Sequence, residues 1–123
     1  MKTGQWEGDY TDVEGHRARI QFKITETGAS IRGEFQLILS TEDQAERYQG
    51  NLTGSANGDA IILHFKMESG EPMVCTLRLQ EPAAYAQEAV FGVVASVPSL
   101  KLGGGVLIAW RFRDTLSESS ARD

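Results

Sequence analysis

The sequence has one cysteine, Cys75, and two histidines, His16 and His64. One cysteine cannot form a disulfide within the chain, so we expect a cytoplasmic protein. Metal sites built from cysteine and histidine need several of these residues at defined spacings, and their scarcity predicts no metal site and no cofactor. Cys75 lies within an apolar segment, where a thiol is an inert part of the core.

Long hydrophobic runs and a positive net charge are also missing. No segment approaches the ~20 apolar residues of a membrane-spanning helix, and no signal-peptide core follows Met1. The net charge of -5 leaves no broad basic surface for nucleic acid or anionic lipid, so we expect neither partner. The length of 123 residues suits one domain. We place it at residues 1–113, followed by a disordered polar tail at 114–123.

What the sequence does have is an apolar residue at every second position, the period of a half-buried strand. In the clearest case Ala18, Ile20 and Phe22 alternate with polar neighbours, and turn signals such as Asn57-Gly58-Asp59 separate such segments. Residues 41–47 are expected to form a polar loop with a brief turn of helix. The pattern predicts eight antiparallel strands near residues 6–10, 17–25, 31–39, 48–54, 61–67, 73–80, 88–97 and 104–113.

Eight sequential strands with short loops form either a closed up-and-down barrel or a two-sheet sandwich. The barrel is favoured because pairing the first strand with the last removes both exposed edges. Inward glycines suit tight coiling of a small barrel wall. They are Gly8, Gly33, Gly50, Gly54 and Gly92. The predicted fold class is therefore all-β, an eight-stranded antiparallel up-and-down meander barrel.

Both chain ends carry aromatic and basic residues. The segment Gly4-Gln5-Trp6 stands near the start, and Arg111 and Arg113 stand near the end. In this the chain resembles the calycins, the superfamily of lipocalins, fatty-acid-binding proteins and avidins. The resemblance implies that the Trp6 indole packs against a guanidinium of the last strand, from Arg111 or alternatively Arg113, and so ties the ends together.

Within that superfamily the size and strand order look most like the avidins. The resemblance implies a binding pocket in the barrel, yet the polar side chains that hold biotin in avidins are not matched. The corresponding positions are Gly8, Phe35 and Leu37, whose side chains donate no hydrogen bond. Biotin binding is therefore not expected.

Strand parity indicates which side chains line the barrel. They either fill it completely or leave a cavity for a small apolar molecule, with Tyr10 and Tyr48 as hydrogen-bonding groups. The candidate ligand-binding residues are Tyr10, Phe22, Phe35, Leu37, Tyr48, Phe65 and Cys75.

The last two predicted strands are apolar on both faces, so one face of each remains outside. Depending on parity, the penultimate strand exposes Phe91 and Val93 or Val90 and Val94. The last strand exposes Leu107 and Ala109 if Val106, Ile108 and Trp110 face inward. Such a strip is rarely left in water, and it predicts a homo-oligomer, a dimer or tetramer, unless a loop or the tail covers it.

These observations favour a non-catalytic binding module that holds a small apolar ligand in the barrel. The alternative is a protein-interaction or assembly domain that uses the apolar outer face of the last strands. A third hypothesis, a cofactor-free isomerase or cyclase, needs a titratable pair inside the barrel. The inward residues offer none, so we assign no catalytic residue.

Overall fold

The computed structural model describes residues 1, 3–40, 45–68, 72–80, 88–95 and 104–111. Arg113 and the predicted tail at 114–123 lie outside these residues. Within them, no helix is long and apolar enough to span a membrane. The eight strands are β1 (Gly4–Asp12), β2 (Arg17–Thr27), β3 (Ser30–Ser40), β4 (Ala45–Asn57), β5 (Ala60–Met67), β6 (Met73–Gln80), β7 (Ala89–Val94) and β8 (Gly105–Arg111).

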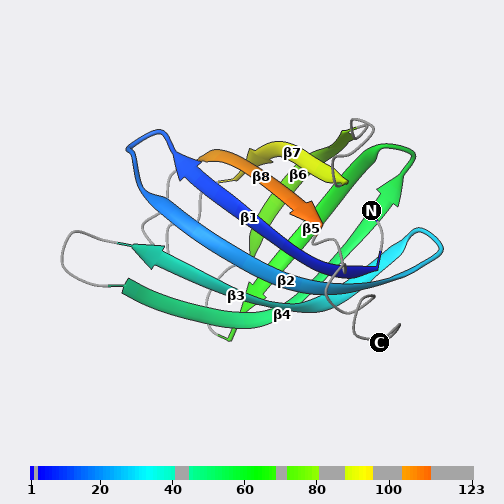
Figure 1. The fold of residues 1–123 in the computed structure, drawn as a ribbon, viewed down its shortest axis with the longest axis horizontal. Helices are drawn as coiled ribbons and strands as arrows, with labels where there is room; N and C mark the ends of the chain where they lie inside the picture. Colours follow the sequence, from blue (N-terminus) through cyan, green and yellow to red (C-terminus); the bar gives the residue numbers. More distant parts are fainter. Residues whose placement is uncertain (2, 41–44, 69–71, 81–87, 96–103, 112–123) are drawn as a thin grey trace, which may run out of the picture.

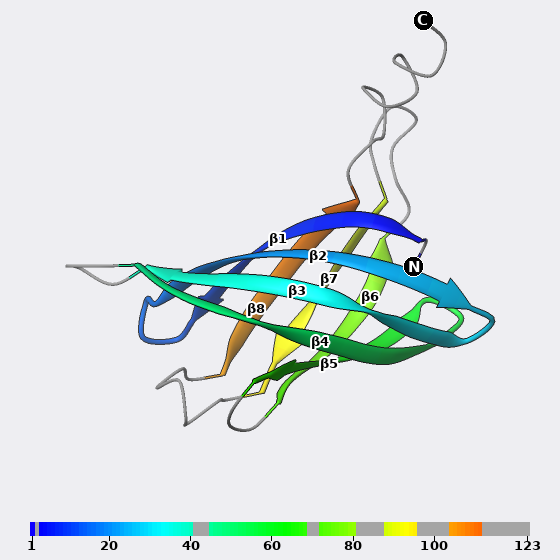
Figure 2. The ribbon, with the colours of Figure 1, turned by 90° about the horizontal axis from the view of Figure 1, so that it is seen from below.

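The strands form a closed barrel in chain order, in which β8 returns to pair with β1. All neighbouring pairs are antiparallel. Figure 1 and Figure 2 show the strongly coiled β1–β4 wall crossing the β5–β8 wall. The prediction of a closed eight-stranded meander is therefore confirmed, and the sandwich alternative is wrong.

One strand begins earlier than the sequence indicated. We expected a loop through residue 47, but residues 45–47 belong to β4 and pair with residues 38–40 of β3. The alternation of buried and exposed side chains is weak at this end of β4, because Glu46 is only partly buried while Ala45 and Arg47 are exposed. Pairing with β3 extends the strand beyond its apolar part.

The core lies inside the barrel and follows the period-two pattern. Along β2, residues 18, 20, 22 and 24 are buried while their neighbours are exposed. Phe65, Leu63 and Ile61 continue the same inward face on β5. Each strand thus contributes one apolar side to a shared interior, which is the main source of stability in such a barrel.

Inward glycines allow the wall to coil tightly, as predicted. A Cβ on Gly33 would lie 1.9 Å from the backbone oxygen of Lys23, and a Cβ on Gly50 would lie 1.9 Å from that of Lys66. Such distances are far inside van der Waals contact, so a side chain at either position requires the neighbouring strand to move. Gly50 is also the first residue of β4 that pairs with β5.

We therefore predict that Gly50→Ala destabilises the fold by roughly 1–3 kcal/mol, the usual range for overpacking. Gly104→Ala is the matched control, because its Cβ would meet only the Val94 oxygen, at an ordinary 3.5 Å. Urea unfolding followed by circular dichroism measures both free energies of unfolding. Equal effects of the two substitutions would contradict the close approach at Gly50.

Candidate functional site

The two chain ends meet as predicted. Trp6 is directly opposite Arg111 in the β1–β8 pair, and the Val13 N–H donates to the Gly104 carbonyl at 3.2 Å just beyond it. In an antiparallel ladder, hydrogen-bonded residue pairs alternate with non-hydrogen-bonded pairs. Because Val13 is hydrogen-bonded to the residue opposite it, the even residues of β1 form the non-hydrogen-bonded pairs, whose side chains lie closest together. Gly4, with a φ of 144°, lies beside the Arg111 stem, since its Cβ would be 3.5 Å from Cδ. A glycine is favoured there on both grounds.

Aromatic rings pack against one another inside the barrel. Trp6 stacks on Phe22 with ring centroids 6.1 Å apart, and Phe65 meets both Phe22 and Phe35 edge to face at 5.5 and 5.2 Å. These are the preferred geometries of aromatic pairs. The candidate ligand-binding residues Phe22, Phe35 and Phe65 therefore come together, but they pack against one another.

The remaining candidate interior residues divide into two groups. Tyr10, Leu37 and Cys75 are buried, whereas Tyr48 is half-buried and its hydroxyl donates to Glu46 Oε2 at 2.6 Å. Burial raises the pKa of the Cys75 thiol to about 12, which agrees with an inert core thiol. Burial, followed by the charges of Asp12 and Cys75, raises the pKa of Tyr10 to about 12.

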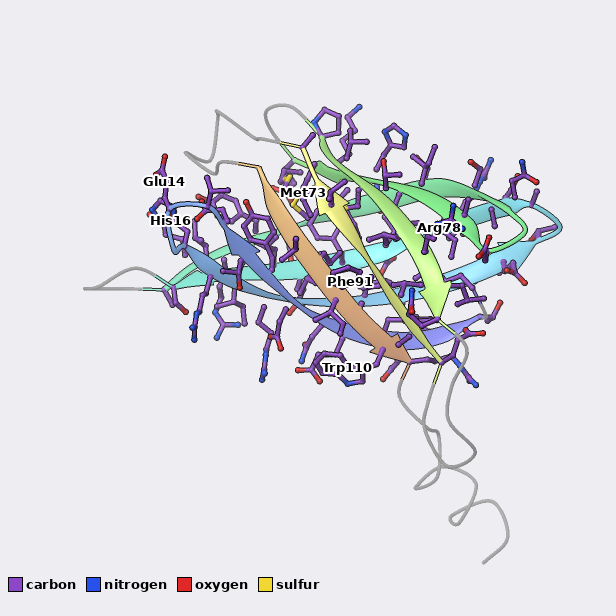
Figure 3. The ribbon with its side chains drawn as sticks, turned by 90° about the horizontal axis from the view of Figure 1, so that it is seen from above. Glu14, His16, Met73, Arg78, Phe91 and Trp110 are labelled. Carbon is purple, nitrogen blue, oxygen red and sulfur yellow. The ribbon has the colours of Figure 1, made fainter. Side chains whose placement is uncertain are left out.

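A cluster of exposed apolar side chains lies on the outer face of β7 and β8. Phe91 is opposite Ile108 and Val93 is opposite Val106, and all four side chains are between 44% and 60% exposed. A third pair, Ala89 and Trp110, extends the surface, because it lies two positions further along the same face and both side chains are half-buried. Figure 3 shows Phe91 on β7 and Trp110 on β8. We call these six residues, Ala89, Phe91, Val93, Val106, Ile108 and Trp110, the β7–β8 face.

The predicted exposure of Leu107 and Ala109 is wrong. Both are fully buried, because they pair with Tyr10 and Gly8, two positions on the face of β1 that is turned into the barrel. Residues directly opposite each other in an antiparallel pair share a face. The sequence pattern indicated Phe91 and Val93 as outward residues, but it did not indicate the outward residues of β8. The expected pairing of Trp6 with Arg111 could have predicted the inward face of β8. Trp6 faces inward, so position 111 and the positions of the same parity, 107 and 109, face inward too.

Charged side chains flank the β7–β8 face on both sides. On β1, Glu7 and Asp9 share one cation, with Arg19 at 3.4 and 3.5 Å from their carboxylates. On β6, Arg78 is next to Phe91 in register, and Asp59 lies 3.1 Å from its guanidinium. The β1 side therefore carries an excess carboxylate, and the β6 side presents an arginine that is 69% exposed.

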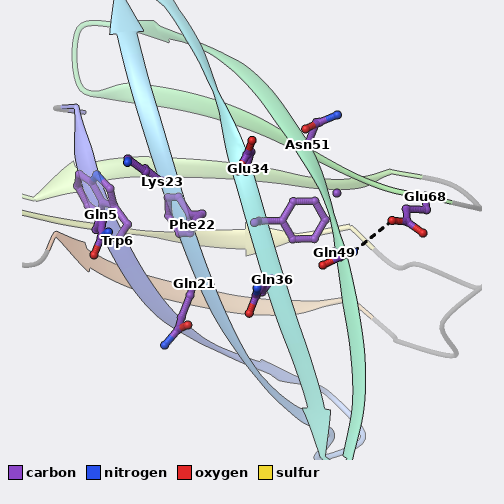
Figure 4. Close-up of a pocket in the computed structure, with 12 residues that line it drawn as sticks. Gln5, Trp6, Gln21, Phe22, Lys23, Glu34, Gln36, Gln49, Asn51 and Glu68 are labelled. Atoms are coloured by element: carbon purple, nitrogen blue, oxygen red, sulfur yellow. Dashed lines mark hydrogen bonds between the residues drawn. The ribbon is translucent and has the colours of Figure 1, made fainter.

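A polar hollow of about 570 Å³ crosses the outer surface of β1–β4 (Figure 4). Gln21, Gln36 and Gln49 follow one another in register across three strands, and the Gln49 amide donates to Glu68 at 3.3 Å. The buried rings of Trp6 and Phe22 also reach the lining. No sequence motif had drawn attention to this row of amides.

A small acidic cluster caps the β1–β2 connection. Asp12 Oδ1 accepts hydrogen bonds from the backbone N–H groups of Glu14 and His16, at 2.9 and 2.7 Å. Its Oδ2 lies 2.7 Å from His16 Nδ1. The side-chain atoms of Asp12, Glu14 and His16 that could bind a metal ion lie within 4.8 Å of one another. The hydrogen bonds account for this cluster without an ion.

Comparison of the chain with protein-family models, curated proteins and solved structures gave no match.

The Asp12 cluster generates a pH prediction. The hydrogen bond to Asp12 and its negative charge raise the pKa of His16, with a smaller contribution from Glu14. Because the pKa is raised on folding, the pair's stabilisation is fully present below the ordinary pKa of ~6.5 and is lost as the pH rises through the raised value. NMR titration of the His16 ring should show a lower pKa in Asp12→Asn than in the wild type. An unchanged pKa in that variant would refute the assignment.

Proposed function

We propose that this protein is a calycin-like barrel that acts as a non-catalytic assembly module, in which two copies pack together through the β7–β8 face. The observation that supports this is the row of three apolar cross-strand pairs on the outer surface. Contiguous exposed apolar patches of this kind mark interaction sites in soluble proteins. We retain the cytoplasm as the predicted compartment.

A second copy is the occupant that the charges favour. A twofold axis parallel to the strands, lying in the interface, places the β1 side of one copy over the β6 side of the other. Asp9 of one copy then opposes Arg78 of the other, while the apolar pairs meet at the centre. A self-complementary patch of this type gives a closed dimer. Opposite charges at the rim favour this orientation over one that brings β1 onto β1.

The aromatic packing inside the barrel supports this function over storage of an apolar ligand. Trp6, Phe22, Phe35 and Phe65 already contact one another in the centre of the barrel. A ligand there would need these rings to move, at the cost of their packing. Binding of a small apolar molecule stays a prediction. The isomerase or cyclase hypothesis likewise stays untested.

Sedimentation equilibrium tests the proposal. We expect the wild type to have twice the chain mass of 13.5 kDa at about 10 µM, in the affinity range of ordinary specific interfaces. Val93→Lys and Ile108→Lys each place a charge within the β7–β8 face, so each should weaken the dimer by about 100-fold or more.

Thr53→Lys is the matched control, because Thr53 is an exposed β-branched residue on the outer face of β4. This variant should keep the dimer mass. A monomeric wild type, or a dimer that survives both face variants, would refute the proposed function. Circular dichroism of each variant verifies that the barrel itself remains folded.

A further inference from the structure

The outer surface of β1–β4 carries a row of side-chain amides. Gln21 on β2 is directly opposite Gln36 on β3, and Gln36 is directly opposite Gln49 on β4. Because directly paired residues share a face, the three carboxamides lie side by side across the strands. Neighbouring strands are about 4.8 Å apart, which is therefore the spacing of the amides. The row lies along the hollow of about 570 Å³, as Figure 4 shows.

These amides have hydrogen-bonding groups available for a ligand. Gln21 and Gln36 are exposed, and in the part of the chain that the structure describes their side chains have no hydrogen-bond partner. Gln49 donates one hydrogen bond to Glu68, which leaves its second N–H and its carbonyl oxygen. A carboxamide both donates and accepts hydrogen bonds. The row therefore matches a ligand whose groups also do both, as hydroxyl groups do.

The charges around the hollow favour a neutral ligand. Lys23 and Glu34 are directly opposite each other on β2 and β3, and Glu68 adds a second carboxylate. An anion would meet two carboxylates and one ammonium group, and a cation would meet the ammonium group in the same place. The other polar side chains of the lining are neutral carboxamides: Gln5, Gln21, Gln36, Gln49 and Asn51.

The hollow offers polar side chains, and neither a free strand edge nor an aromatic platform. The backbones of β2 and β3 are paired with a strand on both sides, so an extended peptide cannot add to them. Trp6 and Phe22 reach the lining with only 1% and 3% of their surface exposed, too little for a ring to stack on a ligand. Neutral hydrogen bonds replace bonds to water and each adds little affinity. A ligand held in this way should bind with a Kd of about 1–10 mM.

We propose that the hollow binds an unbranched neutral oligosaccharide that lies across β2, β3 and β4. Successive sugars of an extended, β-linked chain repeat at nearly the spacing of neighbouring strands, so each sugar meets one amide of the row. Its hydroxyl groups donate to the amide oxygens and accept from the amide N–H groups. This site lies on the β1–β4 wall, apart from the β7–β8 face, and it does not depend on the proposed dimer.

The probe is cellotetraose, a linear β-linked tetrasaccharide of glucose. The side-chain amide resonances of the glutamines are followed by NMR while the sugar is added to about 20 mM, enough to measure a millimolar Kd. We expect shifts at Gln21, Gln36 and Gln49. No shift is expected at Gln80, an exposed glutamine on β6 that does not line the hollow.

Two shorter or differently shaped sugars test the match to the row. Glucose reaches one amide at a time, so its Kd should be at least about tenfold higher than that of cellotetraose. Maltotetraose contains the same sugars in an α-linked, curved chain that does not follow the row. Its Kd should be at least about threefold higher.

Gln36→Ala removes the central amide, so it should raise the Kd of cellotetraose about fivefold or more. Gln80→Ala is the matched control, because it removes an exposed glutamine elsewhere on the barrel and should change the Kd by less than about twofold. Circular dichroism of both variants verifies that the barrel remains folded.

Absence of shifts at Gln21 and Gln36, or equal Kd values for Gln36→Ala and Gln80→Ala, would overturn the proposal. Equal affinities for cellotetraose and maltotetraose would refute the match between sugars and amides. If the same amides shift with protein concentration and the sugar does not compete, a second copy occupies the hollow and the oligosaccharide proposal is wrong. Failure of the assembly proposal shows in the sedimentation mass, so the two outcomes are separable.

Discussion

The pairing of β1 with β8 is the constraint on which the rest of the structure depends. It joins residues at opposite ends of the chain, with Trp6 opposite Arg111 and Gly8 opposite Ala109. Without it both strands would be exposed edges, and the meander would be an open, strongly twisted sheet. Because directly paired residues share a face, this contact also decides which side of β8 enters the core.

Closure has opposite consequences for the two surfaces of the wall. Inside, the rings of Trp6, Phe22, Phe35 and Phe65 pack at preferred aromatic geometries. Outside, β7 and β8 still carry apolar side chains, since both strands are apolar on both faces. The exposed apolar side chains of β7 and β8 therefore lie on the exterior of the barrel, and the proposed assembly function rests on them.

The fold was predictable from the sequence because period-two alternation and turn residues are local signals, and eight such segments leave few topologies. Parity in β8 was not predictable from alternation, since Val106 and Leu107 are both apolar and no polar residue marks the outer face. Only the long-range pairing with Tyr10 and Gly8 decides it. The start of β4 was missed for a related reason. Pairing with β3 makes residues 45–47 a strand, although their composition resembles a loop.

Contacts between Hα protons of β1 and β8 test closure most directly. The hydrogen bond from Val13 to Gly104 fixes the even residues of β1 as closely spaced pairs, in which opposing Hα protons are near enough for nuclear Overhauser effects. The account predicts cross-peaks for Trp6–Arg111, Gly8–Ala109 and Tyr10–Leu107. Their absence in a spectrum that shows the corresponding β1–β2 contacts would contradict the closed barrel.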